Sequence, residues 1–280
     1  MRHTTLHGKQ LLLTWVFGIC GLFILIIAQI WSFIAHVNTV NTSQSHHLII
    51  MTEYIVDQEK YFYWILFHMY TVLCIGPIIM MGTGTMLIIY IEHICGIFKI
   101  ASYRIKHAVN NNIPRNIATK NKILMIEGII CAVDIHRQAM KMMNHFMTTF
   151  KIMISCFTGC VVVCFTCNLY QIASSENNRT NVSEFLFSFV FASVCIIYMF
   201  LANYFGQKII DHNNHVFVTA YNGQWYKTPL HIQRMILFLL QRGAKEFSLN
   251  IGGVFDASIQ GFATLIKASI SYFTVMHSTQ

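Results

Sequence analysis

Long uninterrupted runs of apolar residues dominate the chain, and they alternate with segments that carry nearly all of its charges. A helix needs about 20 mostly apolar residues to cross a bilayer. Five runs meet that length: residues 11–34, 62–91, 152–172, 185–205 and 249–275. The first four contain no Asp, Glu, Lys or Arg, whereas the fifth contains Asp256 and Lys267. This pattern predicts an all-α, polytopic membrane protein with five transmembrane helices.

The composition also favours a membrane protein. Only 11% of the 280 residues are charged and 55% are hydrophobic, whereas a soluble domain is about 25% charged. This balance argues against a soluble enzyme, a disulfide-rich secreted module and a disordered chain. We expect a single membrane domain over residues 1–280. Its helices are joined by four loops, at residues 35–61, 92–151, 173–184 and 206–248.

The Lys and Arg residues divide unequally between the two sides of the membrane. Sixteen of the 19 lie in the N-terminal segment or in the loops 92–151 and 206–248, and the other two loops hold only Lys60 and Arg179. Because cytoplasmic loops are enriched in basic residues, the N-terminus is predicted to be cytoplasmic and the C-terminus extracellular. The net charge of +8 then requires no nucleic-acid partner.

Three N-x-S/T sequons give an independent signal for the orientation. They begin at Asn41, Asn178 and Asn181, and all three fall in the two loops that the charges place outside. Glycans on such sequons are a feature of extracellular loops. The sequence therefore predicts that these asparagines are glycosylated.

Both cytoplasmic loops are apolar enough to form helices. Residues 110–112 and Pro114 interrupt the first loop, and residues 117–170 then continue without a proline, which predicts one long helix that enters the membrane. Asp134 and Arg137 have the i,i+3 spacing of an exposed ion pair. Apolar helices outside the bilayer have to bury their faces, so we expect a cytoplasmic helical bundle between subunits.

The last apolar run carries polar residues at helical spacing. Asp256, Gln260, Thr264, Lys267 and Ser271 follow one another at intervals of 4, 4, 3 and 4 residues. They fall within about 80° of one another on a helical wheel, as the lining of a water-filled conduit requires. Two alternatives stay open: Asp256 lies at the membrane boundary while Lys267 extends outward, or the stripe only binds neighbouring helices.

No catalytic or metal chemistry is indicated. The His, Glu and Asp residues form no cluster with the spacing of metal ligands. Cys156, Cys160, Cys164 and Cys167 have the helical spacing of small packing residues, with a metal site as the alternative. We expect neither an enzyme nor a bound metal or cofactor.

The last 75 or so residues contain a series of motifs: Phe205-Gly206-Gln207, Ala220-Tyr221-Asn222, Trp225-Tyr226, 237–240, Ala244-Lys245, Gly253-Val254-Phe255 and the run 266–274. Together with a Tyr61–Trp64 segment at the outer end of the second run, these motifs resemble the insect odorant receptor family. Members have seven membrane helices, and the five predicted here resemble the third to seventh, so the first two are not found in this sequence. The short second inner loop resembles the odour-tuning subunits rather than the co-receptor.

The resemblance implies a role in olfaction. Tuning subunits join an olfactory co-receptor in a hetero-tetrameric, ligand-gated cation channel in the plasma membrane of olfactory sensory neurons. The seventh helix lines the pore, which implies that Asp256, Gln260, Thr264, Lys267 and Ser271 are pore-lining. A lysine is unusual in a cation pore, so Lys267 is alternatively directed at a neighbouring helix.

The resemblance also places the odorant between the outer halves of the other helices. The residues it suggests there are Trp31, Ile34, Trp64, Phe67, His68, Thr71, Asn168, Phe187 and Phe191. Most are aromatic or aliphatic, and such a lining suits a small, volatile, apolar ligand that binds by burial, at about 25 cal/mol per Å². Helix packing or an interfacial aromatic belt is the alternative, especially for Trp31 and Trp64.

Two other receptor classes fit the sequence less well. A G-protein-coupled receptor fragment is disfavoured by the predicted cytoplasmic N-terminus, and by Glu92-His93-Ile94 where an acidic-Arg-aromatic triplet would stand. A gustatory-type chemoreceptor is the nearer alternative, although the Ser271-Tyr272 pattern favours the olfactory branch. A transporter is disfavoured because the helices show no internal repeat.

Overall fold

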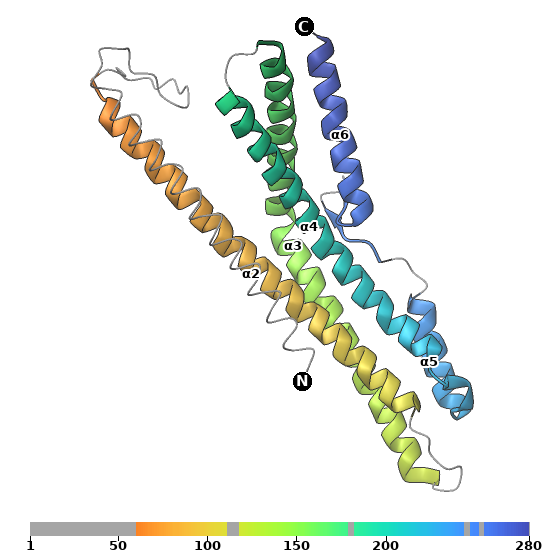
Figure 1. Cartoon of the computed structure of the whole chain (residues 1–280). Helices are drawn as coiled ribbons and strands as arrows, with labels where there is room; N and C mark the ends of the chain where they lie inside the picture. Colours follow the sequence, from red (N-terminus) through yellow and green to blue (C-terminus); the bar gives the residue numbers. More distant parts are fainter. Residues whose placement is uncertain (1–59, 111–117, 179–181, 244–246, 252–254, 280) are drawn as a thin grey trace. The chain divides into compact units, whose positions relative to one another are not determined.

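The computed structural model describes residues 60–110, 118–178, 182–243, 247–251 and 255–279. The elements follow the chain in one order, traced in Figure 1: α2 (Phe62–Asn110), α3 (Ala118–Asn178), α4 (Val182–Asn222), the short 3₁₀-helix η1 (Trp225–Lys227), α5 (Leu230–Gly243), β1 (Asn250–Ile251), β2 (Phe255–Asp256) and α6 (Ile259–Ser278). The predicted helical architecture is confirmed, with one two-stranded ribbon added to it.

Three of the described helices are long and apolar enough to cross a membrane. The qualifying segments are Ile78–Val109 of α2, Ile123–Ser174 of α3 and Ser188–Asn222 of α4. Each exceeds the roughly 20 residues that a bilayer accommodates, so part of each helix extends beyond the membrane. The first predicted span, residues 11–34, lies outside the described residues, and α6, with 20 residues including Lys267, is not among the three.

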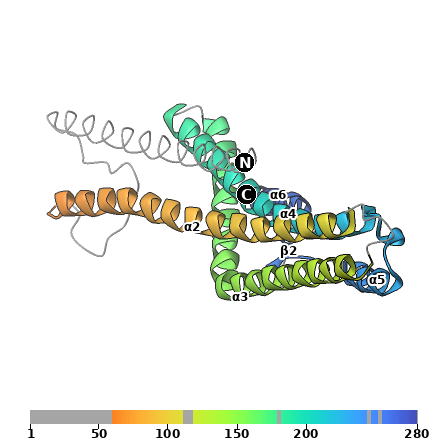
Figure 2. The same cartoon turned by 90° about the horizontal axis from the view of Figure 1, so that it is seen from below.

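The chain divides into two units, residues 1–88 and 89–280. The described part of the first unit is the beginning of α2. In the second unit, the remainder of α2 packs antiparallel to α3, side by side in Figure 2. Tyr90 stacks on Phe146 with ring centroids 5.2 Å apart, and further along α2 the guanidinium of Arg104 donates to the Cys131 sulfur at 2.7 Å.

The second half of α4 completes this bundle. Ser102 on α2 hydrogen-bonds with His215 Nδ1 at 3.0 Å and with Thr219 Oγ1 at 2.8 Å, and Lys208 forms an ion pair with Glu92. Fully buried side chains from the three helices fill the centre, among them Ile94, Phe98, Ile129, Met143 and Val216. The three helices therefore form a bundle within one chain, whereas the sequence analysis expected a cytoplasmic bundle between subunits. The predicted Asp134–Arg137 ion pair is present at 3.3 Å.

Two predicted boundaries are wrong. The outer loop predicted at residues 173–184 is mostly helical, because α3 continues to Asn178 and α4 starts at Val182. The last helix starts at Ile259 rather than at residue 249. Before it, Asn250 pairs with Asp256 and Ile251 with Phe255 in the antiparallel β1–β2 ribbon, whose apolar residues extend the hydrophobic run of α6 toward the N-terminus.

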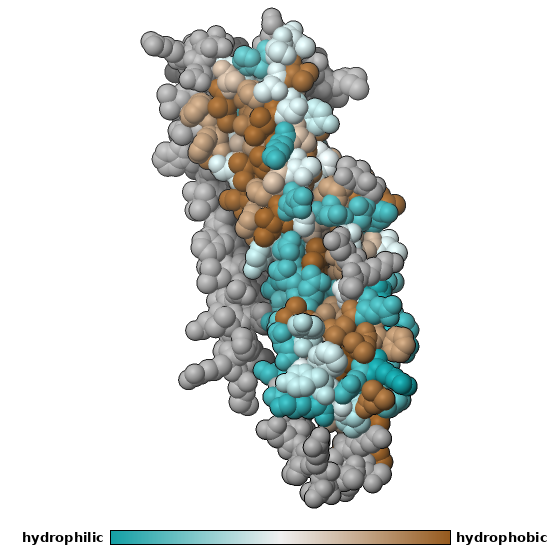
Figure 3. Space-filling view, turned by 90° about the vertical axis from the view of Figure 1, so that its right-hand side faces the viewer, coloured by the Kyte–Doolittle hydropathy of each residue, from teal (hydrophilic) through white to brown (hydrophobic). Residues whose placement is uncertain are grey.

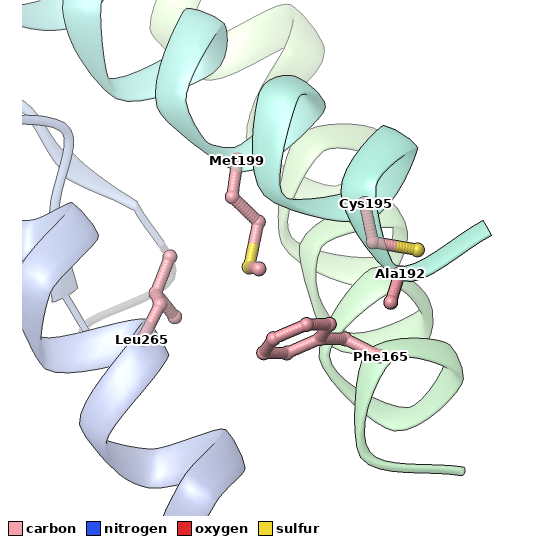
Figure 4. Close-up of a cluster of buried hydrophobic side chains, with 5 residues drawn as sticks. All are labelled: Phe165, Ala192, Cys195, Met199 and Leu265. Atoms are coloured by element: carbon pink, nitrogen blue, oxygen red, sulfur yellow. The ribbon is translucent and has the colours of Figure 1, made fainter. Parts of the chain in front are cut away.

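At the other end of α3 and α4, a compact hydrophobic cluster joins these helices to α6. Phe165 of α3 clusters with Ala192, Cys195 and Met199 of α4 and with Leu265 of α6, and Figure 4 shows its ring directed toward Met199 and Leu265. All five are buried, and Phe262 and Ile266 of α6 pack against the cluster from its edge. The packing of α6 on α3 and α4 therefore depends on its apolar face.

Candidate functional site

The helix α6 has one face buried and the opposite face exposed. Gly261, Leu265 and Ser269 form the buried face, and the Ser269 hydroxyl donates back to the Leu265 carbonyl at 2.9 Å. Gln260, Thr264, Lys267 and Ser271, the predicted stripe, are all exposed. The stripe therefore points away from α3 and α4, and it is not occupied by packing within the described part of the chain.

The exposed stripe is longer than the sequence analysis predicted. Thr274 and Ser278 are also exposed and continue the alternating intervals of four and three residues. From Gln260 to Ser278 the helix makes about five turns at 3.6 residues per turn, so the six side chains line one face from end to end. The spacing of Thr274 and Ser278 is a signal in the sequence that extends the predicted stripe beyond Ser271. We call these six residues the polar stripe: Gln260, Thr264, Lys267, Ser271, Thr274 and Ser278.

Asp256 does not belong to the polar stripe. It lies in β2, before the start of α6, and its carboxylate accepts a hydrogen bond from the Asn250 side-chain amide at 3.1 Å. The prediction that Asp256 shares a helix face with Gln260 is therefore wrong. The helix starts later because Ser258 is extended and caps it, its hydroxyl accepting from the Gly261 N–H at 3.1 Å.

Three hydroxyl groups of the polar stripe donate their protons to backbone carbonyls of α6 itself. Thr264 donates to the Gln260 carbonyl at 3.1 Å, Thr274 to the Ser271 carbonyl at 2.8 Å and Ser278 to the Val275 carbonyl at 2.9 Å. Such bonds to the preceding turn leave the oxygen lone pairs free to accept from outside the helix. A face of outward acceptor oxygens suits contact with water or cations.

Helix α4 holds the start of α6 by close backbone packing. A Cβ atom at Gly206 would overlap the Ala257 carbonyl oxygen and lie 2.6 Å from the Ala257 Cβ. The next residue, Gln207, accepts from the Ile259 N–H at 3.4 Å through its side-chain oxygen. The Phe205-Gly206-Gln207 motif thus has a physical role, because it lets α4 approach the ribbon and the first turn of α6 closely.

Asn203 lies one turn before this contact and is buried, with 3% exposure. Its amide group donates to the Met199 carbonyl at 2.8 Å, while its Oδ1 has no hydrogen-bond partner. A Cβ at Gly261 would stand 3.1 Å from that oxygen, so the Asn203 amide faces the first turn of α6.

The same stretch of α4 is anchored on its other side to α2. Lys208 pairs with Glu92, and the two side chains are only 13% and 17% exposed. Within six residues, from Asn203 to Lys208, α4 therefore contacts both α6 and α2.

A buried histidine joins three helices deeper in the bundle, outside the predicted spans. His136 of α3 hydrogen-bonds through Nε2 with Asn213 Oδ1 at 3.0 Å, and its ring contacts Phe98 and Phe217 with centroids 5.4 and 5.3 Å away. Burial lowers the pKa of His136 from its usual value near 6.5, the hydrogen bond to Asn213 opposes the shift, and the positive charge of Arg242 lowers the pKa further.

The residues suggested for odorant binding that the structure describes lie on α2, α3 and α4. On α2, Trp64 and Phe67 are exposed, with the Thr71 hydroxyl donating to the Phe67 carbonyl at 2.7 Å, and His68 is exposed beside them. Asn168 donates to the Cys164 carbonyl at 2.7 Å, and Phe191 is exposed on α4.

Several predicted residues fall where the structure gives no side-chain description. Phe187 lies within α4 and Asn178 is the last residue of α3, and neither side chain is described. Trp31, Ile34, Asn41 and Asn181 lie outside the described residues. The buried cluster of Phe165, Cys195, Met199 and Leu265 was not singled out from the sequence, because nothing distinguishes these residues within continuous apolar runs.

Comparison with known proteins identifies the family of this chain. Residues 1–270 match the family model described as 7tm Odorant receptor. The chain belongs to the odorant receptor family. With three apolar helices of membrane-spanning length, this odorant receptor is a membrane protein.

Curated members of the family are distant in sequence. Odorant receptor 9a of Drosophila melanogaster is 22% identical over 200 residues, covering 69% of this chain and 46% of that receptor. The odorant receptor coreceptor of the same species is 21% identical over 171 residues, covering 60% of this chain and 34% of that protein. The odorant receptor chain described here thus spans less than half the length of these relatives.

A solved structure gives the fold. The insect olfactory receptor OR5 from Machilis hrabei, determined in complex with eugenol, matches with a TM-score of 0.71 at 12% identity, covering 97% of this chain and 68% of that chain. The odorant receptor fold inferred from the sequence motifs is therefore confirmed by the arrangement of the helices.

Proposed function

We propose that the chain is an odour-tuning receptor subunit that binds small, volatile, mostly apolar ligands and contributes α6 to a ligand-gated cation channel in the perception of smell. The observation that carries the proposal is the exposed polar stripe. Polar and charged side chains are costly against lipid, and the six residues point away from the helices that pack on α6. A water-filled conduit gives that face a favourable environment.

The packing of α6 supports coupling between ligand and conduit. Leu265 is buried against Phe165 of α3 and Met199 of α4, the helices that carry the candidate ligand contacts Asn168 and Phe191. A ligand that favours one arrangement of α3 and α4 over another shifts the equilibrium position of α6 by its difference in affinity for the two arrangements. Burial of apolar ligand surface supplies that affinity.

Assembly with further subunits is part of the proposal. One helix cannot enclose a conduit, so the polar stripe has to meet equivalent faces of other chains, which we take to be the olfactory co-receptor in a hetero-tetramer. The cytoplasmic helix α5 offers a contact surface, because Leu230, Leu237 and Phe238 are exposed, the last at 73%. Figure 3 views this side of the molecule, with brown hydrophobic patches among the teal residues of the lower part. Exposed apolar side chains outside the bilayer favour burial against a partner.

The proposed orientation follows the charges. The N-terminus, the bundle and α5 are cytoplasmic, and the end of α6 faces outward, in the plasma membrane of olfactory sensory neurons. Sixteen of 19 basic residues on one side of the predicted spans support this placement.

Co-expression tests the proposal. Oocytes express this chain by itself, this chain together with a co-receptor, or the co-receptor by itself. Currents are recorded while a panel of volatile ligands is applied. We expect ligand-evoked cation currents whose ligand selectivity depends on this chain, and only when both subunits are present. A ligand-gated current from this chain without a partner would contradict the subunit role, and a ligand response identical to that of the co-receptor alone would contradict the tuning role.

A further inference from the structure

Lys267 is the only Asp, Glu, Lys or Arg residue in α6. At a rise of about 1.5 Å per residue, it lies about 12 Å from the first residue of the helix and about 16 Å from the last. It therefore sits near the middle of the helix, where a charged side chain needs either a partner or water.

The described part of the chain offers no partner for this charge. Lys267 is exposed, and within the described part of the chain it forms no ion pair or hydrogen bond. The helices beside α6 do not carry an acidic residue at this depth, because the predicted spans 152–172 and 185–205 contain neither Asp nor Glu. The predicted spans 11–34 and 62–91 lack acidic residues as well, so a second copy of the chain offers no carboxylate from these four spans either.

Lys267 also shares its face with uncharged acceptors. Thr264 precedes it and Ser271 follows it in the polar stripe, and the hydroxyl proton of Thr264 is bound within the helix. A cation that moves along this face meets oxygen lone pairs, then one ammonium group, then oxygen lone pairs again. The ammonium is the only electrostatic barrier that α6 itself places on that path.

We propose that Lys267 faces the conduit and lowers its permeability to divalent relative to monovalent cations. The inference rests on the proposed pore-lining role of α6. Coulomb repulsion is proportional to the charge of the permeating ion, so a fixed ammonium opposes Ca²⁺ twice as strongly as Na⁺. A tuning subunit with this lysine thereby reduces the Ca²⁺ fraction of the current in the assembled channel.

The test compares bi-ionic reversal potentials of channels formed with a co-receptor. Lys267→Gln is expected to raise the Ca²⁺/Na⁺ permeability ratio at least about twofold, and Lys267→Glu is expected to raise it further. Lys267→Arg is the matched control and is expected to leave the ratio unchanged. A Lys267→Cys channel adds an internal control, because a positively charged thiol reagent is expected to lower its ratio and a negatively charged one to raise it.

Each remaining outcome would overturn the inference in a distinguishable way. Ligand-gated currents with the same permeability ratio in the Gln, Glu and wild-type channels would mean that Lys267 does not face the conduit, and the proposed channel role would stand. Loss of co-assembly with the co-receptor on Lys267→Gln would mean that the lysine pairs with a partner carboxylate. If the chain made no contribution to any current, the proposed function and this inference would both fail.

Discussion

Gly206 on α4 lies against Ala257, the residue that connects β2 to the capping serine of α6, with no room for a side chain between them. This contact fixes where α6 starts relative to α4. The adjoining Gln207 accepts from the first backbone N–H of α6, and Lys208 anchors the same turn of α4 to Glu92. The helix with the polar stripe is thus attached at its N-terminal end and packed through Leu265 further along.

Gly206→Ala is expected to destabilise the protein, because the added methyl group would overlap Ala257. Overpacking of a tight contact costs about 1–3 kcal/mol. Gly159→Ala is the matched control, since a Cβ at Gly159 meets nothing within 4 Å and alanine favours the helix by about 0.5–1 kcal/mol. Thermal unfolding of the purified protein in detergent measures both. An equal effect of the two substitutions would mean that α4 and the ribbon are not in close contact.

Glu92→Gln is expected to lower stability by about 3–5 kcal/mol, because it leaves the Lys208 charge buried without its partner. Asp134→Asn provides the matched comparison. Its ion pair with Arg137 is exposed, with side chains 58% and 70% accessible, and an exposed pair contributes about 0–1 kcal/mol. Denaturation of the two variants under the same conditions should separate them clearly. Similar losses would show that the Glu92–Lys208 pair is solvated in the membrane-bound protein.

The stability of the bundle formed by α2, α3 and α4 is expected to fall as the pH decreases below about 6.5. The pKa of His136 is lowered in the folded state, so the unfolded chain binds more protons than the folded chain between the folded pKa and about 6.5. The free energy of unfolding therefore rises with pH across that window, and the contribution of His136 has its full value above it.

His136→Gln should flatten this dependence while keeping a donor for the Asn213 oxygen. The measurement is the midpoint of unfolding at several pH values between about 5 and 8, the range in which histidine titrates. An identical pH profile in the variant would mean that the His136 ring is accessible to water. Any slope that remains in the variant is expected from His212, whose pKa burial also lowers.

N-glycans are expected on Asn41 and on Asn178 or Asn181, because the charges place all three sequons outside. Glycosidase treatment should increase gel mobility, and Asn→Gln substitutions should abolish that increase. The control is a sequon engineered near Asn111, in the segment between α2 and α3 that the charges place in the cytoplasm. A glycan at that engineered site would reverse the proposed orientation.

The sequence predicted the long helices because their signals are strong and local. Residues 118–178 contain no proline, and α3 runs through all of them. The start of α6 was predicted incorrectly because the ribbon has the composition of a membrane segment: Leu249, Ile251 and Phe255 are apolar, and only the Gly252-Gly253 pair and the capping Ser258 indicate a turn followed by a new helix.

The polar face of α6 could be predicted from the sequence, but its contacts with α4 could not. Periodicity alone placed Gln260, Thr264, Lys267 and Ser271 together, and the structure exposes all four. The fit of Gly206 against Ala257 and the ion pair of Glu92 with Lys208 join residues far apart in the sequence. Such contacts depend on how the helices pack, which a single sequence does not encode in any local pattern.

The central claim is that the polar stripe of α6 lines a water-filled conduit, and the accessibility of single cysteines tests it most directly. Cysteines are placed one at a time at 260, 264, 262 and 265 in a receptor that assembles with a co-receptor, and a small charged thiol reagent is applied during recording. The account predicts reaction and a changed current at 260 and 264, which are exposed, and none at Leu265, which is buried, or at Phe262, which packs against the cluster. Equal reactivity at all four positions would mean a loosely packed helix without a pore. Reactivity at none of them would mean that the stripe binds neighbouring helices, which would contradict the account.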